Sequence, residues 1–107
     1  MKKVMISQPM ANKTGAEIME VRDCAKRYLQ SMDYEVINSY YSDKWRDELI
    51  ENIKESKNTP LFFLAESLKA MSCCDAVYFC WGWQDARGCR IEHEAAKAYD
   101  LEIIYQR

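Results

Sequence analysis

The segment Ala76–Trp81 constrains the fold of this chain most, because every one of its residues is apolar. A short run without polar alternation is typical of a strand that is buried on both faces. Such strands belong to parallel sheets, whose crossover helices cover both faces. The run is followed by a loop that contains Gly82 and Gly88, and then by a helical pattern that ends near Tyr99. A strand, a polar loop and a helix in this order mark the edge at which open α/β sheets bind ligands.

Short apolar runs alternate with helical patterns along the rest of the chain. Strands are predicted at 2–7, at 34–38, from Cys74 or Asp75 through the apolar run, and at 101–105. Helices are predicted at about 15–32, roughly 43–56, 60–72, and from Gly88 or Cys89 to Tyr99. This order predicts one α/β domain over residues 1–107, a three-layer sandwich of the flavodoxin or Rossmann type. Its sheet is expected to be parallel and four-stranded, in the order 2-1-3-4, with helices on both faces.

The helix boundaries carry their own signals. Thr14 with Glu17 three residues later matches a capping box, and Thr59 before Pro60 matches a cap followed by a proline in the first helical position. The first helix is predicted to bury a stripe of mainly apolar residues: Ile18, Val21, Cys24 or Ala25, Tyr28, Leu29 and Met32.

Charge and cysteine content exclude several classes of protein. The net charge of −2 leaves no basic surplus for a nucleic-acid polymer, although a single nucleotide needs only one or two local cations. The apolar runs are too short for a membrane span, and the apolar start is broken by Pro9, which argues against export. The five cysteines form no CxxC pair and the chain has one histidine, so no zinc or other metal site is expected. Their odd number favours a reducing, cytoplasmic location.

Glu92 is the leading candidate for chemistry. Helical spacing predicts that Ile91, Ala95 and Ala98 face the core, with Glu92 beside this stripe in the first turn. There the helix dipole would hold its carboxylate ionised, and an ionised, positioned carboxylate can attack a glycosidic carbon. The alternative is that Glu92 only stabilises the start of its helix, as glutamates in first turns commonly do.

Two aspartates are candidates for a second acid. Asp75 opens the buried strand and could equally stabilise a turn, since the start of a parallel strand lies opposite the ligand edge. Asp85 follows the strand and therefore lies at the ligand edge. Trp81 and Trp83 flank Gly82 at this edge, where they could stack on a base or pack in the core, the core being favoured for Trp81. The lone histidine, His93, is interpreted as a surface or supporting residue.

Two loops could bind the rest of a ligand. Arg87, Gly88 and Arg90 surround a predicted helix start, which suits an anion or a solvated loop equally well. The loop contains neither a Walker motif nor a GxGxxG motif. Ser7 and Gln8 follow the first strand, where they could bind a ribose or phosphate, or only form a loop that Pro9 stops.

Four stretches of the chain together resemble a known family, DUF4406, and more distantly the nucleoside 2-deoxyribosyltransferase superfamily with its deoxynucleoside-monophosphate N-glycosidases. They are KKVMISQPMANKT, CDAVYF, the GW–DARGCRIEHEAAKAY segment and LEIIY. In the superfamily a glycine-rich loop leads to a helix with a nucleophilic glutamate, and Glu92 takes that position. The resemblance likewise implies active-site roles for Asp75 and Asp85, and places Ser7 and Gln8 in the sugar pocket.

The resemblance implies N-glycosidic hydrolysis or deoxyribosyl transfer on a nucleoside or nucleotide, with Glu92 as the nucleophile and no cofactor. Arg90 and Glu94 stand where the superfamily has glycines, and Arg87 with Arg90 would suit a phosphorylated ligand. A non-catalytic module that binds nucleotides in the same cleft is the alternative. A third possibility is an interaction protein with exposed aromatic residues at Tyr40, Tyr41 and Trp45. A homo-oligomer is also expected, because the sheet has edge strands to protect.

Overall fold

A computed structural model describes residues 1–37 and 56–107 of the chain. The sheet contains four parallel strands in the order β2-β1-β3-β4. The strands are β1 (Lys2–Ser7), β2 (Tyr34–Ile37), β3 (Ala76–Phe79) and β4 (Glu102–Tyr105). The predicted strand order and the α/β class are therefore confirmed. The helix predicted near 43–56 and the aromatic residues Tyr40, Tyr41 and Trp45 fall outside the described residues, except for the end of that helix.

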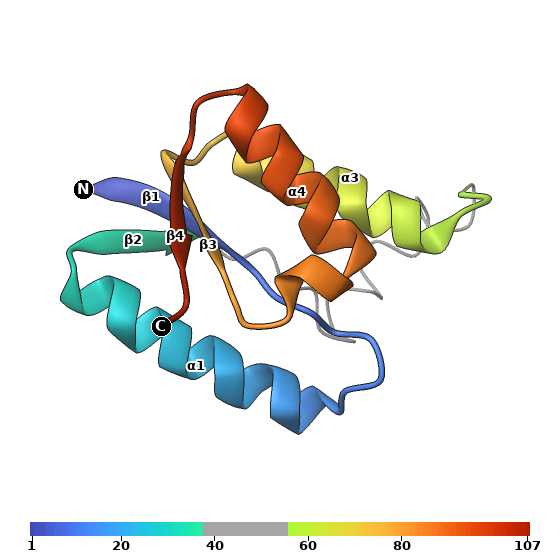
Figure 1. Ribbon diagram of the computed structural model, residues 1–107, viewed down its shortest axis with the longest axis horizontal. Coiled ribbons are helices and arrows are strands. Elements are labelled where there is room, and N and C mark those ends of the chain that lie inside the picture. The colour runs from blue at the N-terminus through green and yellow to red at the C-terminus, as the bar shows by residue number, and fades with distance from the viewer. Residues whose placement is uncertain (38–55) are drawn as a thin grey trace.

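Helices cover both faces of the sheet, as the fully apolar strand β3 requires. Figure 1 shows α1 (Gly15–Ser31) on one side of the strands and α3 (Thr59–Met71) with α4 (Arg87–Ala98) on the other. The side chains of each strand alternate between two apolar cores. The core under α1 contains Val4, Ile6, Ala25, Leu29, Ala76, Tyr78 and Cys80. The core under α3 and α4 contains Met5, Met71, Cys74, Val77, Phe79 and Ala96.

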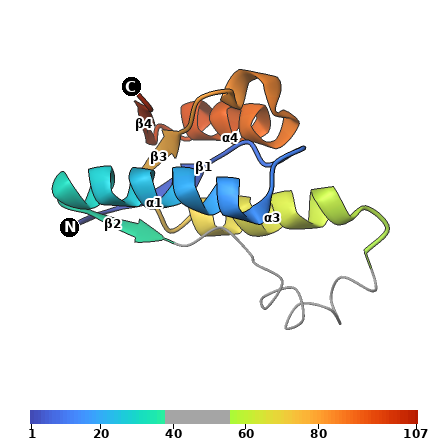
Figure 2. The same ribbon diagram turned by 90° about the horizontal axis from the view of Figure 1, so that it is seen from below.

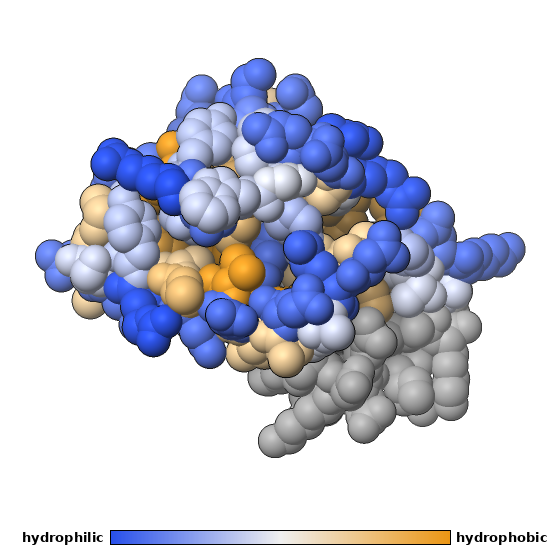
Figure 3. Space-filling model, turned by 60° about the horizontal axis from the view of Figure 1, so that its bottom comes forward, coloured by the Kyte–Doolittle hydropathy of each residue, from blue (hydrophilic) through white to orange (hydrophobic). Residues whose placement is uncertain are grey.

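The outer surface on the α1 side is mostly hydrophilic. Figure 3 shows that the apolar side chains exposed on this face lie in small patches between hydrophilic ones. The predicted stripe of α1 is correct at Ile18, Leu29 and Ala25, the last taking the position that Cys24 could also have filled, but Tyr28 and Met32 are exposed. The buried face of α1 includes Arg22 instead.

Capping side chains fix where two of the helices begin. The Thr14 hydroxyl accepts a hydrogen bond from the Glu17 backbone N–H (3.1 Å) and donates one to the Glu17 carboxylate (3.2 Å). At α3 the capping residue is Asn58, one residue before the predicted Thr59, and its side-chain oxygen accepts from the Leu61 N–H (3.1 Å). An asparagine satisfies a free N–H of the first turn as well as a threonine does, which explains the earlier start.

The loops after β1 and β3 lead to α1 and α4 and lie at the same end of the sheet (Figure 2). A short 3-10 helix, η1 (Trp83–Asp85), stands in the second loop. Gly82 precedes η1 with φ of 88°, and a Cβ at this position would lie 3.5 Å from Cγ of Pro9. The two loops therefore meet at the carboxyl ends of the central strands, the edge at which this fold class binds ligands.

Candidate active site

The end of β1 supplies two buried polar side chains to this edge. Ser7 pairs with Phe79 of β3, and the Cys80 N–H donates to the Ser7 carbonyl oxygen (2.9 Å). The side-chain amide of Gln8 donates from Nε2 to the carbonyl oxygen of Ile18 in α1 (2.8 Å). The sheet therefore fixes the backbone of Ser7 and α1 holds the side chain of Gln8, both at the carboxyl edge where the sequence predicted them.

Glu92 lies on the buried face of α4 and is only 8% exposed. This face consists of Cys89, Glu92 and Ala96, spaced three and four residues apart. The predicted stripe is therefore wrong, since Ile91 and Ala98 are exposed and Ala95 is only partly buried. Small side chains at 89 and 96 let the helix pack closely on the sheet, and this rotation turns Glu92 inward.

The proton affinity of Glu92 also differs from the sequence expectation. Because α4 begins at Arg87, Glu92 lies in the second turn rather than the first. Burial raises the pKa of its carboxyl to about 7, although the Ser7 hydroxyl and the positive charge of Arg22 act in the opposite direction. The helix start therefore does not hold Glu92 fully ionised, and its carboxyl exchanges a proton near neutral pH.

Arg22 is the buried partner of this site that the sequence interpretation missed. It is 1% exposed, and all its guanidinium nitrogens are buried. Its charge lowers the pKa of Glu92 and opposes the burial that raises the pKa of the Cys80 thiol to about 12. The signal was available, because position 22 lies on the same helical face as Ile18, Ala25 and Leu29.

Buried polar side chains of the described residues gather at this one edge of the sheet. They are Ser7, Gln8, Arg22 and Glu92. The Ser7 hydroxyl also partly opposes the burial that raises the pKa of the Cys89 thiol to about 11, so this thiol is protonated at neutral pH. Away from water, charges and dipoles interact strongly. The arrangement therefore provides a carboxyl that can act as nucleophile or proton carrier, with a cation and a hydroxyl beside it.

The two candidate aspartates lie at different edges. Asp75 is exposed at the amino end of β3, where its carboxylate accepts a hydrogen bond from the Lys3 N–H (2.9 Å). The strand from Asp75 to Phe79 spans about 13 Å, so the structure does not bring Asp75 to the edge that holds Glu92. Asp85 is exposed in η1 and lies at the same edge as Glu92.

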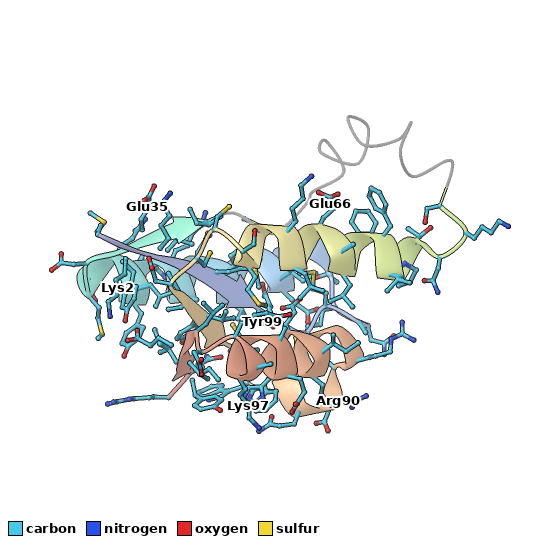
Figure 4. All side chains as sticks on the ribbon, turned by 90° about the horizontal axis from the view of Figure 1, so that it is seen from above. Lys2, Glu35, Glu66, Arg90, Lys97 and Tyr99 are labelled. Atoms are coloured by element: carbon cyan, nitrogen blue, oxygen red, sulfur yellow. The ribbon has the colours of Figure 1, made fainter. Side chains whose placement is uncertain are left out.

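The start of α4 separates the two candidate arginines. Arg87 and Gly88 line a hollow of about 290 Å³ together with Asn58 of the α3 cap. Arg90 instead donates from Nη1 to the carbonyl oxygen of Gln84 (3.2 Å). Figure 4 shows Arg90 with Lys97 on the side of α4 that is turned away from α3. Arg87 thus lies with Gly88 at the hollow beside α3, whereas Arg90 lines a different hollow, together with Trp83 and His93.

The Trp83 ring is packed against other rings of the protein. It stacks on His93 at 4.1 Å between centroids and lies 5.4 Å from Phe79 and 5.9 Å from Tyr105. His93 Nε2 forms a hydrogen bond with the Tyr105 hydroxyl (2.8 Å), and burial lowers the pKa of this histidine. Trp81 is 68% exposed, so the prediction that it packs in the core is wrong. Sequence spacing could not show this cluster, since its members come from four elements: β3, η1, α4 and β4.

Comparison with known families identifies the chain. A family model described as "Domain of unknown function (DUF4406)" matches residues 2–105. The chain belongs to the DUF4406 family. Searches of curated proteins and of solved structures each gave no match.

For this DUF4406 domain, the structure unites Ser7, Gln8 and Glu92 at one edge and leaves Asp75 at the other. Within residues 1–37 and 56–107, no group of three or more histidine, cysteine, aspartate or glutamate side chains could hold a metal ion. No helix in these ranges combines the length and the apolar character that crossing a bilayer requires.

Proposed function

We propose that this DUF4406 protein cleaves the N-glycosidic bond of a nucleoside or nucleoside monophosphate, by hydrolysis or by transfer of the deoxyribosyl group, with Glu92 as the nucleophile. The burial of Glu92 beside Ser7 at the carboxyl edge of the sheet carries the proposal. Buried carboxyls with shifted pKa values are concentrated at functional sites. The sequence resemblance to the nucleoside 2-deoxyribosyltransferase superfamily supports the same role for this residue.

The proposed reaction has two steps. A carboxylate oxygen of Glu92 attacks the anomeric carbon, and the bond from that carbon to the base nitrogen breaks with its electron pair going to the base. The base takes up a proton as it leaves. Water, or the nitrogen of a second base, then attacks the anomeric carbon, loses a proton and releases the Glu92 carboxylate. The first acceptor gives hydrolysis and the second gives transfer.

Asp85 is the better candidate for the proton donor. It follows β3 in the loop at the same edge as Glu92, whereas Asp75 lies at the amino edge and is bonded to the Lys3 N–H. A general acid must come within hydrogen-bonding distance of the leaving base. We therefore assign Asp75 a structural role in joining β1 and β3.

A phosphate on the substrate would find its cation at the start of α4. No side chain caps this helix, and Arg87 and Gly88 open onto the hollow beside it. Unbonded backbone N–H groups at a helix start and an arginine both favour anions. This arrangement supports nucleoside monophosphates as substrates ahead of free nucleosides.

The experiment is to incubate the purified protein with a panel of nucleosides and deoxynucleoside monophosphates and to measure released base by chromatography. The wild type is expected to release base from at least one of them, and E92Q to lose this activity while it still binds the ligand. E94Q is the matched control, because Glu94 lies on the same helix but is exposed and pairs with Lys97 at 3.8 Å. The proposal fails if the wild type binds these compounds without releasing base, or if E92Q and E94Q are equally active.

The second candidate function is a non-catalytic module that binds nucleotides. The low exposure of Glu92 favours this binding role over catalysis, because the anomeric carbon of a substrate would have to reach a carboxylate that the protein largely covers. In this case Arg87 and Gly88 would hold the phosphate, and the buried carboxyl would only support the edge. Equal affinities for a monophosphate in the wild type and in E92Q, with no base released by either, would identify this function.

A further inference from the structure

Trp81 is a large aromatic side chain that the protein holds rigidly in solvent. It follows β3 by two residues and is 68% exposed. Its backbone N–H donates to Oε1 of Gln106 (2.8 Å), and its indole Nε1–H donates to the Gln106 carbonyl oxygen (3.0 Å). Exposed tryptophans fixed in this way are typical of binding surfaces, because little conformational entropy is lost when a ligand contacts them.

A hollow of about 320 Å³ lies next to this ring. Its lining consists of Phe79, Trp81, Gly82, Trp83, Gln84, Tyr105 and Gln106. Gly82, with its left-handed backbone, makes the turn between the two tryptophans. Stacking on His93 and Tyr105 fixes the second tryptophan ring, Trp83. The hollow is thus built on two aromatic side chains whose positions are set by the protein.

The chemistry of the lining selects a flat, uncharged ligand. None of the lining residues carries a charge at neutral pH, so a phosphate would find no counter-charge there. The aromatic rings offer stacking surfaces, and Gln84 and Gln106 add amides. Gln106 uses its oxygen for Trp81, which leaves its NH2 group for a ligand acceptor. The Gln84 amide has no hydrogen-bond partner within the described part of the chain. It is therefore available to a ligand, and a glutamine amide can bond to adjacent donor and acceptor atoms of adenine.

We propose that the hollow between Trp81 and Trp83 binds a purine base, stacked on the exposed Trp81 indole ring and hydrogen-bonded by the Gln84 and Gln106 amides. The proposal rests on the proposed function, for which it names the base subsite. The site adjoins the edge that holds Glu92, because Phe79, which lines the hollow, pairs with Ser7 of β1. The charged and uncharged parts of a nucleotide would then occupy different subsites, with the phosphate at Arg87 and the base at Trp81.

The test is calorimetric titration of the full-length protein with adenine alone, which carries neither sugar nor phosphate. The wild type is expected to bind adenine, and W81A to bind it about tenfold more weakly, since stacking on an aromatic side chain accounts for roughly this factor or more. W81F keeps a ring and is expected to retain most of the affinity. Y99A is the matched control, because Tyr99 is also exposed but lies at the other end of α4.

The results separate this inference from the proposed function. Equal adenine affinities in the wild type, W81A and Y99A would overturn the base subsite, as would an absence of adenine binding at millimolar concentration. Weaker adenine binding in W81A would support the subsite even if no glycosidic activity is found. Free adenine does not need the nucleophile, so E92Q is expected to bind it as the wild type does. If W81A releases base with the same KM as the wild type, this result would support the reaction and contradict the subsite.

Discussion

The two edges of the same sheet hold their carboxylates in opposite ways. At the amino edge Asp75 is exposed and accepts from the Lys3 N–H (2.9 Å), while Glu102 pairs with Lys2 (3.5 Å) and accepts from the Tyr34 hydroxyl. At the carboxyl edge Glu92 is buried beside Ser7 and the charge of Arg22. The first arrangement links strands at the surface, whereas the second places charge where water is excluded.

The two edges differ in the free energy that folding must supply to form them. Exposed ion pairs and hydrogen bonds contribute little to stability and cost little. Burying a carboxyl and a guanidinium costs several kcal/mol per ion unless they support each other, on the order of the net stability of a small domain. A feature that is expensive for folding and adds little stability is best explained by function. The predictions below test this contrast, beginning with the largest expected effect.

Neutralising one carboxylate at each edge should affect turnover very differently. In the proposed reaction E92Q removes the nucleophile and is expected to lower kcat by on the order of 10³-fold or more. D75N, at the edge about 13 Å away along β3, should keep turnover within about twofold of the wild type. Base release from the best substrate measures both. Loss of activity in D75N with a folded protein would place Asp75 in the site after all.

Arg22 is expected to be the most important charged residue for stability. Removing one member of a buried set of opposite charges costs about 3–5 kcal/mol, so R22Q should lower the free energy of unfolding by roughly that amount. R27Q is the control on the same helix, where Arg27 is exposed and contacts only Cys24 Sγ (3.4 Å) among the bonds that the structure shows. Urea unfolding measures both variants. Equal midpoints for R22Q and R27Q would contradict a buried charged centre.

The pH dependence of stability should carry the signature of Glu92. Its pKa is raised from 4.5 to about 7 in the folded protein, so the folded state binds more protons than the unfolded state between these values. Stability contributed by this group is therefore present below pH 4.5 and is lost as the pH rises through 7, by about 3 kcal/mol in total. E92Q lacks this titration, so the stability of the wild type relative to E92Q should fall by about 3 kcal/mol between pH 4.5 and pH 8. If the free energies of unfolding of the wild type and E92Q differ by the same amount at pH 4.5 and at pH 8, this titration is ruled out.

The smallest effect is expected at the amino edge. D75A removes the acceptor for the Lys3 N–H and should lower the free energy of unfolding by about 1 kcal/mol. D23A provides a comparison at an exposed aspartate of α1, outside the sheet. Hydrogen exchange at the Lys3 amide should become faster in D75A alone. If D75A loses several kcal/mol of the free energy of unfolding, the stability of the amino edge, too, depends on its polar contacts.

The sheet could be predicted from the sequence, whereas the interior of the site could not. Apolar runs such as 76–81 determine the strands, and the alternation with helices determines their order. The rotation of α4 depends on what the helix packs against, so counting apolar residues selected Ile91 and Ala98 over Cys89 and Ala96. Helical spacing places Arg22 on the buried face of α1, but it cannot show that Glu92, on another element, lies close to it.

Titration of the Glu92 carboxyl by ¹³C NMR, assigned with E92Q, tests the central claim most directly because it needs no substrate. A carboxyl that is buried beside Ser7 and Arg22 at the carboxyl edge should titrate with a midpoint near pH 7. R22Q should move this midpoint upward, since the charge that favours ionisation is removed. A midpoint near 4.5 in the wild type, unchanged in R22Q, would show that Glu92 lies in water and would contradict the account.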